Sequence, residues 1–95
     1  MIAPADIERA FREVYSERIA SWDDTHVQPR CSRWVSIPRL RRKTGGDVWE
    51  VGKVVRKMRE EGRLVYRGRD ATYSFAVCPG GFVYETSLLV ARAGF

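Results

Sequence analysis

Aromatic and charged side chains recur at intervals of three and four residues within the segment 48–61. Trp49, Lys53 and Arg56 share this spacing, which places them on one face of an α-helix. Arginine can make two bonds to a guanine edge, lysine suits phosphates, and the carboxylate of Glu50 could accept a bond from cytosine. The chemistry that these residue types indicate is base recognition in a nucleic acid, by Trp49, Glu50, Lys53 and Arg56.

Further cations gather in the same part of the sequence. Residues 30–69 hold thirteen Lys and Arg against four Asp and Glu, a net charge of +9, whereas the rest of the chain sums to −4. Such segregation creates a one-sided field that attracts polyanions. A merely solvated basic surface is the other interpretation. We expect eight of these cations to contact a phosphate backbone: Arg39, Arg41, Arg42, Lys43, Lys57, Arg63, Arg67 and Arg69.

The residue types do not indicate a catalytic site or a metal site. The chain has one histidine, no glycine-rich phosphate loop and no nucleophile paired with a base, so we do not expect an enzyme. Cys31 and Cys78 could bind a metal with His26 and with Asp23 or Asp24, but zinc ligands usually come in closely spaced pairs. We therefore expect two free thiols, no metal and no cofactor.

The length of 95 residues is enough for one domain with a single core. No apolar run approaches the roughly 20 residues of a membrane helix. The first residues lack the basic and apolar regions of a secretion signal. We expect a cytoplasmic protein, associated with the nucleoid if the source is prokaryotic.

Two segments before the glycine pair 45–46 are predicted helices. In residues 5–22, apolar side chains recur at i, i+3, i+4 and i+7. A shorter helix, 37–43, would begin after Ser36, whose hydroxyl can cap the first turn, and would end at the glycine pair. Residues 33–35 are expected to form a short strand between them, because Trp and Val favour strands.

The segment 48–61 is predicted to be a third helix. Asp47 and Glu50 have the spacing of a capping box, and Gly62 would end the helix. Gly52 in its middle costs about 1 kcal/mol relative to alanine, which indicates that a phosphate or another helix approaches closely there. The inner face of this helix is expected to bury an apolar stripe: Val48, Val51, Val54, Val55 and Met58.

Two stretches of alternating apolar residues follow, 63–67 and 72–77, with turn-forming residues between them. They predict a β-hairpin with a basic tip. The tail, residues 82–95, fits a strand by its alternation or a short helix capped by Ser87. Its apolar side chains would either cap the domain's own core or pair with a second copy of the chain.

This order of helix, strand, helix, turn, helix and hairpin resembles the winged helix-turn-helix superfamily over about residues 7–77. The resemblance is carried by VSIPRLRRKTGG and DVWEVGKVVRKMREEG as the helix-turn-helix and by RLVYRGRDATYSF as the wing. It implies an α+β fold with three helices, a β-hairpin wing and a short C-terminal extension, divided into a domain 1–78 and an extension 79–95. It also implies that helix 48–61 lies in the major groove of DNA and that the wing, 67–71, contacts the backbone or the minor groove.

Three functions are compatible with these features. Binding of double-stranded DNA, by a small transcriptional regulator or an accessory factor of a mobile element, accounts for most of them. The alternative is a protein-interaction module that uses Trp49 and the apolar tail. RNA binding is the third, with Trp34, Tyr66 and Tyr73 stacking on bases. A homodimer through the tail would suit two DNA half-sites.

Overall fold

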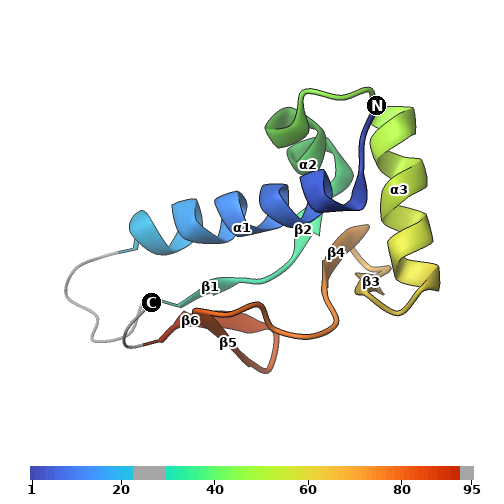
Figure 1. Ribbon diagram of the computed structural model, residues 1–95. Helices are drawn as coiled ribbons and strands as arrows, with labels where there is room; N and C mark the ends of the chain where they lie inside the picture. Colours follow the sequence, from blue (N-terminus) through green and yellow to red (C-terminus); the bar gives the residue numbers. More distant parts are fainter. Residues whose placement is uncertain (23–29, 93–95) are drawn as a thin grey trace.

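The computed structural model describes residues 1–22 and 30–92. In chain order the elements are α1 (Pro4–Ala20), β1 (Arg30–Ser32), β2 (Val35–Ser36), α2 (Ile37–Thr44), α3 (Val48–Glu60), β3 (Leu64–Arg67), β4 (Thr72–Phe75), β5 (Phe82–Glu85) and β6 (Leu88–Ala91). This part of the chain is an α+β fold with three helices and two small antiparallel sheets (Figure 1). None of the three helices is long and apolar enough to cross a membrane.

Helix α1 connects the two halves of the structure. Helices α2 and α3 lie near its N-terminal end, and the sheet with strand order β1-β6-β5 lies below its C-terminal half (Figure 1). The other sheet has the order β2-β4-β3. Its strands β3 and β4 form a hairpin after α3, and the short strand β2, which precedes α2, pairs with β4. The buried face of α1 supplies much of the core that both sheets share: Ile7, Ala10, Phe11, Val14 and Tyr15.

The C-terminal tail forms a hairpin that packs on the domain's own core. Strand β6 is the central strand of its sheet and pairs with β5 on one side and with β1 on the other. Its residues Leu88, Leu89 and Val90 pair with β1. Phe82 and Leu89 belong to the same buried cluster as the α1 residues, and the ring of Phe82 lies 5.6 Å from that of Tyr15. The helix predicted after Ser87 is therefore wrong, and the strand interpretation is confirmed for this segment.

The caps of α2 are those expected from the sequence. The hydroxyl of Ser36 accepts a hydrogen bond from the backbone N–H of Arg39 at 3.4 Å. Helix α2 ends at Gly45, whose φ of 72° is a left-handed conformation that glycine adopts without strain. These local signals set the length of α2 and the turn that leads into α3.

The start of α3 departs from the predicted capping box. Asp47 caps the helix by accepting a bond from the N–H of Trp49 at 2.7 Å. Glu50, however, does not reach back to the cap residue, since its carboxylate accepts a bond from the backbone N–H of Ile2. Half of the predicted box is thus wrong, because the segment before α1 competes for the glutamate.

Three further expectations from the sequence are corrected. The strand predicted at 33–35 is confirmed only at Val35, which begins β2, because Arg33 and Trp34 lie between β1 and β2. The second hairpin strand ends at Phe75, and the side chain of Val77 is 82% exposed. Val48, assigned above to the buried stripe of α3, is 47% exposed at the edge of that stripe.

Candidate nucleic-acid interface

The two faces of α3 differ as its sequence pattern predicts. Val51, Val55 and Met58 are buried against the rest of the domain. Trp49 lies on the opposite face with 74% of its surface exposed, and Lys53 and Arg56 are exposed beside it. Because Trp side chains are seldom left so exposed, the outer face of α3 has the composition of a contact surface rather than of an inert one.

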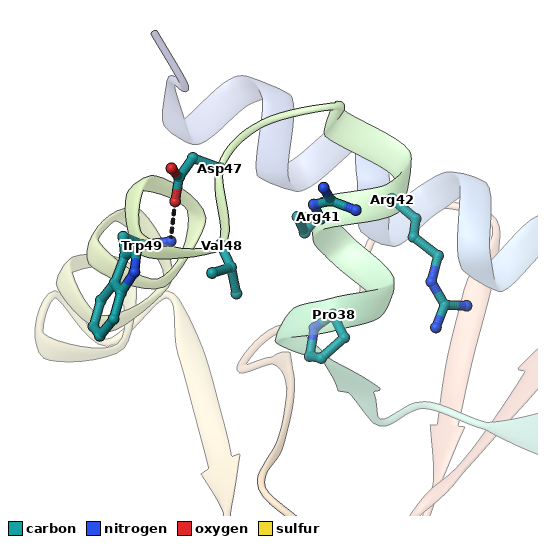
Figure 2. Close-up of a pocket in the computed structure, with 6 residues that line it drawn as sticks. All are labelled: Pro38, Arg41, Arg42, Asp47, Val48 and Trp49. Carbon is teal, nitrogen blue, oxygen red and sulfur yellow. Dashed lines mark hydrogen bonds between the residues drawn. The ribbon is translucent and has the colours of Figure 1, made fainter.

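An open cleft of about 580 Å³ separates the start of α3 from α2. Figure 2 shows it with Val48 of α3 directed toward α2 and Arg41 of α2 lying between the helices, while Trp49 points outward on the far side of α3. The side chain of Arg42 points away from α3 along the α2 side of the cleft. The cleft is thus lined by two cations and by the apolar groups of Pro38, Val48 and Trp49. Asp47, which caps the start of α3, also lines it.

The side chain of Arg56 fills the space beside Gly52. A β-carbon built on Gly52 would stand 3.2 Å from Nη2 of Arg56, and the glycine is buried. The guanidinium therefore lies back along α3, in contact with the turn before it. The nearest atoms to that β-carbon belong to Arg56 of the same helix and not to a neighbouring helix, so the packing of another helix does not account for this glycine. Close approach of a phosphate stays a prediction.

Three of the expected site residues have side chains that bond or pair with the N-terminal segment or with α1. Glu50 bonds to the N–H of Ile2, as described above. Lys43 pairs with Glu17 of α1. Arg63 pairs with Glu8 of α1, and its Nη1 lies 3.8 Å from the carboxylate of Glu61. These contacts direct Lys43 and Arg63 toward α1, and they hold Glu50 beside the N-terminal segment.

In the turn between β3 and β4, Arg67 is held by Asp70. The Nε atom of Arg67 donates to one carboxylate oxygen of Asp70 at 3.0 Å, and Nη2 donates to the other at 2.5 Å. The guanidinium also stacks on Trp34, with Cζ 4.7 Å from the ring centroid. Hydrogen bonds from Arg67 and then from Thr72 lower the pKa of Asp70 to about 2. Arg67 is therefore partly neutralised at the base of the wing.

The remaining expected cations carry no ion pair within the described part of the chain. They are exposed on α2, on α3 and in the β3–β4 turn, and they number seven: Arg39, Arg41, Arg42, Lys53, Arg56, Lys57 and Arg69. Strands β5 and β6 lie below α1 and away from α3 (Figure 1), so the described part of the tail, up to Arg92, leaves the outer face of α3 uncovered. The seven cations do not all lie together, because Arg39 lines a hollow against α1 and Lys57 lines one against the N-terminal segment. We call Trp49 and the four cations nearest to it the cationic face: Arg41, Arg42, Lys53 and Arg56.

The structure adds residues that the sequence analysis did not select. Pro38 and Val48 line the cleft, although one was assigned to a helix start and the other to the core. Arg59 lies over the ring of Tyr66 in β3, with Cζ 4.6 Å from the ring centroid, and so connects α3 to the wing. The helical period places Arg59 between the buried and the exposed faces of α3, and this position could have indicated a contact with a neighbouring element.

The free thiols are Cys31 and Cys78, both half-buried, and burial raises the pKa of each. His26, Asp23 and Asp24, considered above as metal ligands, lie outside the described residues. Across residues 1–22 and 30–92, no three His, Cys, Asp or Glu side chains are grouped closely enough to hold a metal ion.

Comparisons with protein-family models, with curated proteins and with solved structures found no match to this chain. Function is therefore inferred from the residues of the chain and from their geometry.

Proposed function

We propose that the protein binds double-stranded DNA as a winged helix-turn-helix domain, with α3 in the major groove and the β3–β4 hairpin against the backbone or the minor groove. The order α1, β2, α2, α3, β3, β4 is compatible with that layout. An α-helix fits the major groove, where each base pair presents a distinct pattern of donors and acceptors. Such a protein would act as a small transcriptional regulator or as an accessory factor of a mobile element.

The observation that carries the proposal is the uncovered outer face of α3. Trp49, Lys53 and Arg56 are exposed side by side on it, and the cleft beside them holds Arg41 and Arg42. Exposed cations around an accessible helix supply both the electrostatic attraction and the groups that read base edges. The acids of α1 lie elsewhere, since Glu8 and Glu17 pair with Arg63 and Lys43.

The proposal is tested by titrating a labelled random duplex pool with the wild-type protein and with Lys53→Ala and Arg56→Ala. We expect each substitution to weaken binding about tenfold, within the range for a lost charge-assisted contact to DNA, with no loss of thermal stability because both side chains are exposed. Arg9→Ala is the matched control, since Arg9 lies on α1 and pairs with Asp6 and Glu13. Equal duplex binding by the wild type and both α3 variants would disprove the proposal.

The protein-interaction alternative keeps Trp49 as an exposed aromatic anchor. It loses Phe82 and Leu89 from the apolar tail, because both are buried in the domain's own core. RNA binding by stacking is less favoured for a similar reason. Tyr73 is 5% exposed and contacts Tyr66, and Trp34 already stacks with the guanidinium of Arg67.

A homodimer through the tail stays a prediction. Its candidate surface is smaller than the whole tail, because Phe82 and Leu89 are buried. Val83 is exposed on β5, whose outer edge has no partner strand in its sheet, and Val77 is exposed just before it. An edge strand of this kind can pair with a second copy. Light scattering across a concentration series should give the mass of a dimer, and Val83→Lys should reduce it to that of a monomer.

A further inference from the structure

An apolar patch lies inside the cationic face. Val48 is 47% exposed and Trp49 is 74% exposed. With Ile37 and Pro38 they line a hollow of about 380 Å³ between α2 and α3, and Arg56 stands at its edge. The hollow adjoins the larger cleft that contains Arg41 and Arg42 and shares three of its lining residues, Pro38, Val48 and Trp49.

Helix formation does not require an apolar side chain at position 48. Val48 is the first residue of α3, immediately after the cap, and β-branched residues have only moderate helix propensity. Its side chain faces the hollow and not the core, as Figure 2 shows. An exposed valine beside an exposed tryptophan makes a contiguous apolar surface, and such surfaces commonly mark a contact site.

The charges around the patch select its occupant. Arg41, Arg42 and Arg56 surround it, and they are exposed and without ion pairs among the described residues. A polyanion is the partner that such a rim attracts. The apolar group that duplex DNA presents in its major groove is the C5-methyl of thymine, and small apolar side chains are its usual contacts.

We infer that the hollow at the start of α3 reads a thymine methyl group, with Val48 and Pro38 as its contacts and Ile37 and Trp49 among its other lining residues. The inference rests on the proposed binding of duplex DNA, and it adds a base preference to that function. Arg41 of α2 and Arg56 of α3, which line the cleft and the hollow, are then close enough to the duplex to contact its phosphates. A·T pairs are favoured at this position of the site because cytosine lacks the methyl.

The test begins with the duplex most enriched from a random pool by the wild-type protein. Each thymine of that duplex is replaced singly by deoxyuridine, which removes only the C5-methyl. We expect about a fourfold loss of affinity at one or two positions, the value of one buried methyl group, and no change at the others. Val48→Ser should bind the thymine and deoxyuridine duplexes equally at those positions. Ala20→Ser, a change from an apolar to a polar side chain at the exposed end of α1, should discriminate as the wild type does.

The outcomes separate the inference from the function on which it rests. Equal binding of every deoxyuridine duplex by the wild type would overturn the methyl contact and leave DNA binding standing. Unchanged discrimination by Val48→Ser would overturn it as well, and so would a pool from which no sequence is enriched. Absence of salt-dependent binding to any duplex would instead refute the proposed function, and an apolar protein partner would then be the better occupant of the hollow.

Discussion

The guanidinium group of Arg56 lies over Gly52, one turn earlier on α3. A β-carbon at Gly52 would stand 3.2 Å from Nη2 and 3.6 Å from Cζ of Arg56. This contact accounts for a glycine in the middle of a helix that otherwise follows its apolar period closely. The glycine gives the arginine room to lie flat against α3 in the free protein.

Gly52→Ala should stabilise the protein. Alanine is favoured over glycine inside a helix by about 1 kcal/mol, and the one close neighbour is the end of a flexible, exposed side chain that can move away. We expect the free energy of unfolding in urea to rise by about 0.5–1 kcal/mol. Gly62→Ala is the matched control and should destabilise by about 1–2 kcal/mol, because Gly62 has a φ of 77°. A loss of stability in Gly52→Ala would show that the position is packed more tightly than the contact indicates.

The salt dependence of DNA binding should distinguish cations that carry ion pairs from those that do not. If about six cations neutralise phosphates, log affinity should fall with log salt concentration at a slope near −5. Lys57→Ala should make that slope shallower by about one, since Lys57 is exposed and unpaired in the described structure. Arg63→Ala should change it less, because Arg63 pairs with Glu8 and Glu61. Equal changes in the two variants would show that the Arg63 ion pairs open on DNA.

Local signals in the sequence were enough to predict the three helices and the β3–β4 hairpin. The apolar period of α1, the cap at Ser36 and the left-handed glycine at position 45 all act within a few residues of one another. The exposed face of α3 followed from the same period. Its placement on the molecular surface could be predicted because the helix has one apolar side only.

Features that depend on distant segments could not be predicted in this way. Strand β1 has only three residues, too few for its alternation to be recognised, and it is held by its pairing with Leu88, Leu89 and Val90 of β6. The pairing of Lys43 with Glu17 joins two helices that meet only in the folded chain. Local spacing assigned such residues by charge alone, so the expected phosphate contacts included cations that the fold directs elsewhere.

Asp70→Asn should strengthen DNA binding. The substitution removes a negative charge from the wing and leaves Arg67 with at most one of its two hydrogen bonds, because the amide nitrogen of asparagine cannot accept. The freed guanidinium can then contact a phosphate, so the salt slope should become steeper by about one. Glu85→Gln also breaks an arginine–carboxylate pair, with Arg30 at 3.1 Å, but it lies in the β1-β6-β5 sheet away from the cationic face. Unchanged or weaker binding by Asp70→Asn, measured by anisotropy, would remove Arg67 from the interface.

The pKa of Asp70 should rise when Arg67 is replaced. In the wild type the bonds from Arg67 and Thr72 hold it at about 2, below the ordinary value. A lowered carboxyl pKa stabilises the folded state above pH of about 4, and the contribution is lost as the pH falls toward 2. In Arg67→Gln we expect the pKa to return toward its ordinary value, followed by NMR titration of the carboxyl carbon. A pKa that stays near 2 in the variant would assign the shift to Thr72 or Arg69.

Ser74→Ala should destabilise the protein through a buried polar cluster that connects the two sheets. The hydroxyl of Ser74 is fully buried, accepts a bond from Nε of Arg33 at 3.0 Å and lies 3.2 Å from the hydroxyl of Tyr15. Since the hydroxyl of Tyr15 donates to the backbone carbonyl of Arg33 at 2.8 Å, Ser74 is the donor in its bond to Tyr15. The same guanidinium stacks on Tyr84 of β5 at 3.9 Å, so it spans from β4 to the tail hairpin.

Removing this hydroxyl leaves the half-buried guanidinium of Arg33 without one of its acceptors, and a hydrogen bond to a charged group contributes about 1.5–3 kcal/mol. We expect the free energy of unfolding in urea to fall by that amount in Ser74→Ala, because the alanine cannot replace either bond. Ser16→Ala, on the exposed face of α1, should stay within about 0.5 kcal/mol of the wild type. If both variants are equally stable, water reaches the cluster, and Arg33 does not depend on Ser74 to hold the β2-β4-β3 sheet against the tail.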